Sequence, residues 1–169
     1  MSTLKGKAWV FGSNINTDII IPFRFKSRTN DPNELAQYCM YGIDPEFPKK
    51  ISRGDMIVAG KNFGGGSSRE QAAIAIKHCG ISAVVAESFS RIFTRNSFAI
   101  GLPILEVQNI SKNTRQWDEL EIDVENLIVK NTQTKKTFNA KKWPEFLLGI
   151  LREGGLKEYY LRHKKFPWE

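Results

Sequence analysis

The chain has 169 residues, of which 41% are hydrophobic and 25% charged, enough for one folded domain with a buried core. No apolar run reaches the length of a signal-peptide core or a membrane span, and the two cysteines are too few for a disulfide framework, so we expect a cytoplasmic protein without a membrane partner. The formal net charge is +7, but Lys and Arg are scattered rather than gathered with aromatics on one element, which disfavours nucleic acid as a partner.

The first third of the chain predicts a strand, a turn and a helix. Residues 7–11 alternate apolar and polar side chains, which is typical of a half-buried strand. Residues 14–18 have turn composition and lead into three isoleucines that stop at Pro22. Asp31 followed by Pro32 is a typical helix start, and we expect that helix to continue to Met40.

The middle of the chain predicts a strand–helix–strand unit. Residues 56–59 and 83–86 are short apolar runs bounded by turns, and the stretch 67–79 between them carries a helical stripe of small and apolar side chains that ends before Gly80. This order implies parallel strands joined by a right-handed crossover. A further helix is predicted over 90–98.

The last third has a different character. Residues 120–124 and 127–129 alternate around Glu125 and Asn126 as in a hairpin, and 136–138 can add a third strand. Short helices are expected over 144–152 and 156–162, on either side of Gly154-Gly155. The predicted fold class is α/β, a single compact β/β/α domain over 1–169 with mixed parallel and antiparallel strands.

The stretch 60–72 carries the strongest chemical signal. Three glycines there permit unusual backbone conformations and let a ligand approach the main chain. Two hydroxyls and an arginine follow, and a guanidinium can hold a carboxylate with two charge-assisted hydrogen bonds. The stretch therefore predicts a site for a small carboxylate-bearing molecule, formed by Gly65, Gly66, Ser67, Ser68 and Arg69.

This stretch has three other interpretations. Ser67 with Glu70 three residues later fits a capping box, which would make both residues structural. The lysine of a phosphate-binding loop and the spacing of a dinucleotide-binding loop are both missing, so nucleotide binding is disfavoured. A self-sufficient serine hydrolase would need a histidine with an orienting acid, and His78 and His163 have no such spacing and are expected at the surface.

Three segments in order resemble one known family. Residues 60–72, 16–22 and 86–96 closely resemble the motifs of the swivelling domain of the aconitase superfamily. Chain length and the Gly154-Gly155-Leu156 ending resemble the small subunits of 3-isopropylmalate dehydratases, in the short form shared with archaeal-type homoaconitases. Gly65 departs from the pattern, because the family often has another residue there, and glycine should be tolerated.

The resemblance implies that this chain is one subunit of an enzyme with two kinds of subunit. Such proteins are hydro-lyase subunits that isomerise 2-isopropylmalate and 3-isopropylmalate by dehydration and rehydration, in leucine biosynthesis, and that are active only with a large subunit. That subunit holds a [4Fe-4S] cluster through three cysteines, so this chain would bind no metal, and Cys39 and Cys79 are expected in the core. The alternatives are a homoaconitase small subunit or that of another hydroxy-diacid dehydratase, such as a 2,3-dimethylmalate dehydratase.

The resemblance also assigns roles to single residues. Ser67 matches the family's alkoxide base, and Asp18 lies in the Thr-Asp-x-Ile element expected near the catalytic cleft, although Thr17 and Asp18 could instead serve a turn or cap. Substrate contacts are expected from Arg69, Ser68, Gly65, Gly66, Thr17 and Arg28. Arg28 belongs to the loop 23–30, which faces the substrate's variable group in the family; it could alternatively point to solvent. Arg91 and Arg95 are expected in ion pairs or a subunit contact.

Overall fold

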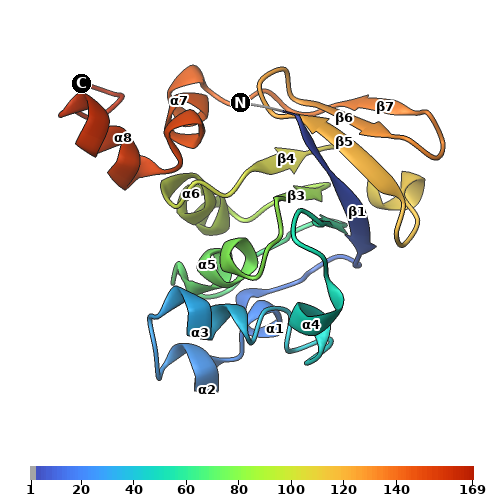
Figure 1. Ribbon diagram of the computed structural model, residues 1–169, viewed down its shortest axis with the longest axis horizontal. Helices are drawn as coiled ribbons and strands as arrows, with labels where there is room; N and C mark the ends of the chain where they lie inside the picture. The colour runs from blue at the N-terminus through green and yellow to red at the C-terminus, as the bar shows by residue number, and fades with distance from the viewer. Residues whose placement is uncertain (1–2) are drawn as a thin grey trace.

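Seven strands in the described part of the chain form one mixed sheet in the order β4-β3-β2-β1-β5-β6-β7 (Figure 1). The structure is a computed structural model that describes residues 3–169. The first four strands pair in parallel and the last three add in antiparallel fashion onto β1. The strands are β1 Leu4–Val10, β2 Met56–Ala59, β3 Ala83–Ala86, β4 Ile104–Glu106, β5 Glu119–Asp123, β6 Ile128–Asn131 and β7 Thr137–Asn139.

Eight helices and one 3-10 turn accompany the sheet in the described residues. Figure 1 shows α1, α2 and α3 gathered at one end of the molecule beside α5, with the β5–β7 sheet at the opposite end. Helix α3 packs against α5. The helices are α1 Thr17–Ile20, α2 Phe23–Lys26, α3 Pro32–Ala36, α4 Phe47–Lys50, α5 Gln71–His78, α6 Arg91–Ala99, α7 Glu145–Glu153 and α8 Leu156–His163, and the 3-10 turn is Ser111–Asn113. None of the helices over 3–169 has both the length and the apolar character needed to span a bilayer.

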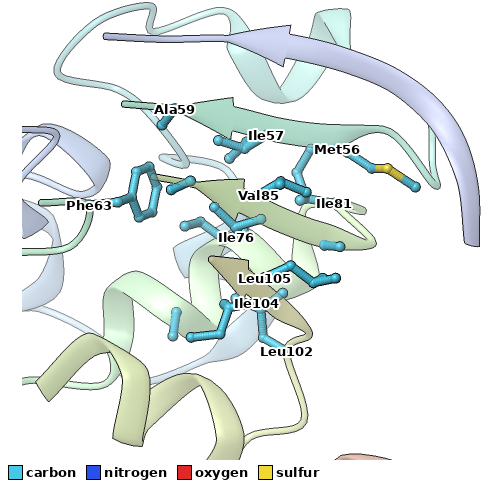
Figure 2. Packing of buried hydrophobic residues seen from close by; sticks show 14 of the residues in the cluster. Met56, Ile57, Ala59, Phe63, Ile76, Ile81, Val85, Leu102, Ile104 and Leu105 are labelled. Atoms are coloured by element: carbon cyan, nitrogen blue, oxygen red, sulfur yellow. The ribbon is translucent and has the colours of Figure 1, made fainter. Parts of the chain in front are cut away.

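The core lies between the parallel strands and the helices that cover them (Figure 2). Every residue of β2 and β3 is buried, as expected for parallel strands covered on both faces. Ile76 of α5 and Phe63 from the loop after β2 pack onto these strands. Each such side chain contributes about 1.5–3 kcal/mol when fully removed from water. The loops at the strand ends therefore begin from tightly packed strands.

Most predicted elements are confirmed. Strands 56–59 and 83–86 have the predicted bounds, they are parallel, and the 120–129 hairpin and its third strand are present. The fold class is thus the mixed α/β arrangement expected. Asp31 caps α3 by accepting a hydrogen bond from the Asn33 N–H at 2.8 Å, but the helix ends at Ala36 and continues only as turns to Met40.

The start of α5 corrects the sequence prediction. The helix begins at Gln71 rather than at Ser67, Glu70 is its N-cap, and no side chain caps it. The predicted capping box is therefore wrong: the Ser67 Oγ accepts from the Arg69 N–H at 3.3 Å, a local turn contact instead. Tertiary hydrogen bonds of the main chain at Ser67 and Ser68, described below, compete with helix formation over these residues.

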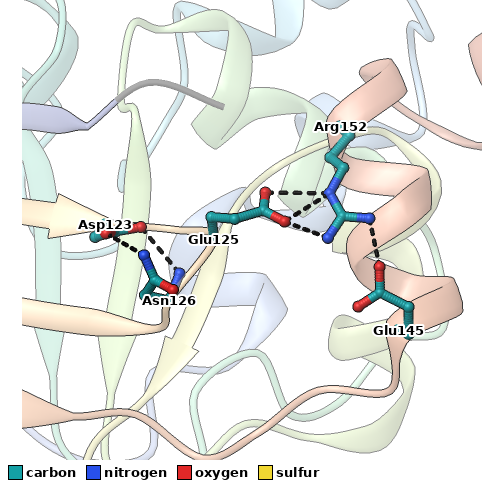
Figure 3. Close-up of polar contacts among 5 residues, drawn as sticks. All are labelled: Asp123, Glu125, Asn126, Glu145 and Arg152. Atoms are coloured by element: carbon teal, nitrogen blue, oxygen red, sulfur yellow. Dashed lines mark hydrogen bonds and ion pairs between the residues drawn. The ribbon is translucent and has the colours of Figure 1, made fainter.

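The C-terminal helices are tied to the hairpin by one arginine (Figure 3). The guanidinium of Arg152 on α7 pairs with Glu125 in the β5–β6 turn and with Glu145 in the first turn of its own helix. Its Nε lies 2.9 Å from Oε1 of Glu125. The break between α7 and α8 falls at Gly154 and Gly155, whose φ angles of +91° and +139° are ones that favour glycine. This confirms the predicted glycine break.

Candidate active site

The three segments singled out in the sequence meet at one edge of the sheet. Residues 14–18 follow β1, residues 60–70 follow β2, and residues 87–90 follow β3. Because these strands are neighbours and parallel, their carboxyl ends lie side by side. This edge is where open α/β sheets bind ligands. The topology thus brings together segments that lie more than seventy positions apart at their extremes.

Two of the three glycines are required by the backbone. Gly64 has a φ of +81°, and a Cβ there would lie 2.2 Å from Cγ of Phe93. Gly66 has a φ of +101°. Gly65 lies outside the positive-φ region, and its Cβ would meet nothing nearer than the Asn62 side chain at 3.4 Å. A residue other than glycine fits at position 65, so this departure from the family pattern has a structural explanation.

Helix α1 holds the glycine turn from one side. The Thr17 N–H donates to the Gly65 carbonyl at 2.8 Å, and the Thr17 Oγ1 accepts from the Ser67 N–H at 3.0 Å. Asn16 caps α1 by accepting from the N–H groups of Asp18 and Ile19 at 3.0 and 2.9 Å. Since the Thr17 side chain is buried, its role in the described structure is to fix Ser67.

Helix α6 holds the same turn from the other side. The Ser90 Oγ donates to the Gly64 carbonyl at 2.8 Å and accepts from the Phe93 N–H at 3.1 Å, so it is also the N-cap of α6. The Asn96 Nδ2 donates to the Ser68 carbonyl at 3.0 Å. These contacts explain the Ser-Arg-Ile-Phe-Thr-Arg-Asn motif as a support for the turn.

Ser67 and Arg69 emerge from this frame toward solvent. Ser67 is partly buried, while Ser68 and Arg69 are exposed. The main-chain N–H of Arg69 points at the Ser67 Oγ, and such a donor stabilises an oxygen on which negative charge develops. The Arg69 guanidinium lies 5.2 Å from the ring centre of Phe23, a contact that orients it without using its hydrogen-bond donors.

A cavity of about 480 Å³ lies between the turn and residues 23–30, a segment that was expected to be a loop and whose first half is helix α2. Its floor is fixed by Gln71, whose buried amide donates at 2.9 Å both to the Lys26 carbonyl and to the Asn30 Oδ1. The Lys26 Nζ is buried and lies 2.7 Å from the Asp18 Oδ1. The cavity is lined by Phe23, Lys26, Ser27, Asn30, Arg69, Glu70 and Gln71.

Other basic residues lie outside this cavity. Arg28 is exposed, and its guanidinium lies 5.6 Å from the ring centre of Phe25. Arg91 and Arg95 line a separate hollow beside Lys141. His78 and His163 are exposed, as predicted, and the latter pairs with Glu153 at 3.0 Å.

The cysteines do not fit an iron–sulfur site. Cys39 is fully buried, Cys79 is partly buried against the same core, and both are free thiols. Burial raises the pKa of the Cys39 thiol well above its ordinary value, whereas cluster ligation requires thiolates. No group of three or more His, Cys, Asp or Glu over 3–169 is arranged to hold a metal ion.

Comparison with known proteins gives one consistent answer. The aconitase C-terminal domain family matches residues 10–110. A solved structure of 3-isopropylmalate dehydratase from Methanocaldococcus jannaschii superposes with a TM-score of 0.90 at 46% identity, covering 96% of each chain. This chain belongs to the aconitase family.

Its relatives within the aconitase family are small subunits. The isopropylmalate/citramalate isomerase small subunit of Methanocaldococcus jannaschii is 50% identical over 94% of each chain. The 3-isopropylmalate dehydratase small subunit of Caldicellulosiruptor bescii is 52% identical over 92% of this chain and 93% of its own. The family resemblance inferred from the three motifs is therefore confirmed.

The structure adds three cavity-lining residues that were not among the predicted site residues. Lys26, Asn30 and Gln71 line the cavity, although nothing in their spacing along the chain indicates that they meet. Gln71 follows the Ser-Arg-Glu motif directly, but its partners are more than forty positions away. No local signal in the sequence marks Lys26, because it is buried while its basic neighbours Arg24 and Arg28 are exposed.

Proposed function

We propose that this chain is the small subunit of a hydro-lyase that interconverts 2-isopropylmalate and 3-isopropylmalate. The observation that carries the proposal is the outward-facing Ser67 and Arg69 on a turn fixed by Thr17 and Asn96, in a chain about half identical to subunits with that name. The turn forms one wall of an active site, and a large subunit supplies the other wall.

In this proposal Ser67 accepts the proton from the carbon next to a substrate carboxylate. A serine hydroxyl is a very weak acid, so its alkoxide has to be stabilised by donors that are already in place. The Arg69 N–H, 3.3 Å from the Ser67 Oγ, is one such donor. The Arg69 side chain and Ser68 add positive charge and a hydroxyl for the substrate carboxylate.

Loss of the hydroxyl from the neighbouring carbon then completes the dehydration. The C–H electron pair forms the double bond, the C–O bond on the neighbouring carbon breaks, and the hydroxyl takes up a proton from an acid of the large subunit and leaves as water. Adding water back with the opposite orientation gives the isomer, with Ser67 returning the proton to carbon. We place Asp18 beside this step, where its carboxylate would orient a water or a partner side chain, and Arg28 on the loop toward the substrate's variable group.

The iron–sulfur chemistry expected of the aconitase family would come from the partner. Burial raises the pKa of the Cys39 thiol, and two cysteines are too few for the three ligands that the family's cluster takes from cysteine. We propose a heteromer in which the large subunit carries a [4Fe-4S] cluster that acts on the departing hydroxyl. Two free thiols are compatible with a reducing compartment, so we propose that the enzyme works in the cytoplasm.

Reconstitution under anaerobic conditions with candidate large subunits tests the proposal. Formation of the unsaturated diacid, followed by its absorbance, should be fastest from 3-isopropylmalate. Homocitrate tests the homoaconitase alternative and 2,3-dimethylmalate tests the other dehydratase. Citramalate is included because one relative's name contains it. Faster turnover of homocitrate than of isopropylmalate would contradict the proposed substrate.

A further inference from the structure

Lys26 on α2 carries a buried charge at the floor of the cavity. Only 2% of its side chain is exposed, and its Nζ lies 2.7 Å from the Asp18 Oδ1. Over residues 3–169 this ammonium has no hydrogen-bond partner of regular geometry, and its contact with Asp18 is an ion pair. Removing an ammonium from water has a large free-energy cost unless the ammonium is well paired. A single ion pair offsets little of that cost, so this arrangement is expected to add little stability.

The two members of the pair are buried very unequally. The Asp18 side chain is 67% exposed, against 2% for Lys26. An exposed carboxylate ordinarily rotates freely and gains little from a surface ion pair. Here the fixed member is the lysine, so the pair restricts the aspartate.

Lys26 is itself held on both sides. The Gln71 amide binds its carbonyl at 2.9 Å, and the preceding Phe25 stacks on Tyr38 with ring centres 3.9 Å apart. Gln71 also begins α5, directly after the turn that carries Ser67 and Arg69. A rigid support of this kind is what a precisely oriented side chain requires.

We propose that Lys26 is a positioning residue that holds the Asp18 carboxylate in one orientation at the edge of the active site. The inference rests on the proposed function, which places Asp18 beside the reacting substrate. Lys26 acts through Asp18 and does not contact substrate, because its Nζ lies beneath the surface. Burial of Lys26 thus serves to orient Asp18 rather than to stabilise the fold.

The first test measures the orientation in the full-length chain without any partner. Three-bond couplings in labelled protein report the χ1 angle of Asp18, and they should show one staggered rotamer. Lys26→Met should give averaged couplings. The matched control is Lys50→Met, which removes an ion pair of the same 2.7 Å length with Asp44 far along the chain, and it should leave Asp18 unchanged. Averaged couplings in the unmodified chain, or no change in Lys26→Met, would overturn the proposal whatever the enzyme's substrate.

Thermal unfolding separates positioning from stability. Lys26→Met leaves Asp18 in water and removes the cost of a buried charge, so its Tm should be unchanged or higher. Asp18→Asn leaves the ammonium without a counter-charge and should lower the Tm. A larger loss for Lys26→Met than for Asp18→Asn would make the pair a stability element and overturn the proposal.

The second test uses the reconstituted enzyme and a double-mutant cycle. Lys26→Met should lower kcat by about 10- to 100-fold with little change in KM, because a misplaced catalytic group loses rate rather than binding. The same change in an Asp18→Asn background should cause no further loss. Independent, multiplying losses would mean that Lys26 acts without Asp18. Normal turnover by Asp18→Asn would show that Asp18 takes no part in the reaction and would refute that part of the proposed function. The χ1 couplings test the Lys26–Asp18 pair independently of turnover.

Discussion

The Thr17 hydroxyl accepts a hydrogen bond from the main-chain N–H of Ser67 across 3.0 Å, which links the loop after β1 to the loop after β2. Thr17 is buried, so this contact is shielded from water. It fixes the residue proposed as the base through its backbone, leaving the Ser67 side chain available for chemistry.

Thr17→Val should therefore impair activity more than folding. Valine has nearly the same shape but no acceptor, and leaving the Ser67 N–H unpaired should cost about 1–3 kcal/mol in the free energy of unfolding. We expect kcat of the reconstituted enzyme to fall by on the order of 100-fold through misplacement of Ser67. Urea unfolding and steady-state kinetics measure the two effects. Thr132→Val in the hairpin is the control for loss of a threonine hydroxyl bond, and it should leave kcat unchanged.

The two neighbouring glycines should respond oppositely to alanine. Gly64→Ala places a Cβ 2.2 Å from the Phe93 ring at a φ of +81°, so we expect a loss of at least about 2 kcal/mol in unfolding free energy. Gly65→Ala meets no such obstacle and should be neutral or stabilising by up to about 1 kcal/mol, because alanine restricts the unfolded chain. Chemical denaturation of both variants checks this. Equal destabilisation would contradict the backbone description of the turn.

The two arginines assigned to substrate differ in their surroundings. Arg69 lines the cavity, whereas Arg28 lies over Phe25 outside it. Arg69→Ala should raise KM on the order of 100-fold, as expected for loss of a charge-assisted carboxylate contact. Arg28→Ala should raise it less. Steady-state kinetics on 3-isopropylmalate decide the point, and a larger effect at Arg28 would show that the loop closes over the substrate.

Acid should weaken the tie between the hairpin and α7. Hydrogen bonds from the Arg152 guanidinium hold the pKa of Glu125 below its ordinary value. The unfolded chain therefore binds more protons in this range, so the stability from this pair is complete above about pH 4.3 and is lost as the pH falls below it. Arg152→Gln should lose less stability between pH 7 and pH 3 than the unmodified chain. Unfolding free energies at the two pH values test this, with Lys157→Gln on the exposed face of α8 as the control.

The sequence predicted elements well where one local signal dominated. β2 and β3 are uninterrupted apolar runs between turns, and Gly154-Gly155 marks a break that only glycine accommodates easily. The predicted start of α5 at Ser67 was wrong, because the capping pattern there is a local signal. Tertiary hydrogen bonds from Thr17 and Asn96 override it. Propensity cannot foresee such competition.

The site was predictable in part for a similar reason. The motifs predicted Ser67, Arg69 and Thr17 as site residues, and parallel strand order explains why they meet. Lys26 and Gln71 were missed because their partners depend on how the loop 23–30 folds back onto α5. Because lysines are mostly exposed in proteins, the sequence alone predicts a surface position for Lys26.

The measurement that bears most directly on the account is turnover by Ser67→Ala in the reconstituted enzyme. If residues 64–69 supply the base, the variant should assemble with the large subunit at unchanged affinity while kcat falls by about 100- to 10,000-fold. Ser52→Ala, on the exposed surface, should behave as the unmodified chain does. Turnover by Ser67→Ala equal to that of the unmodified enzyme would contradict the account.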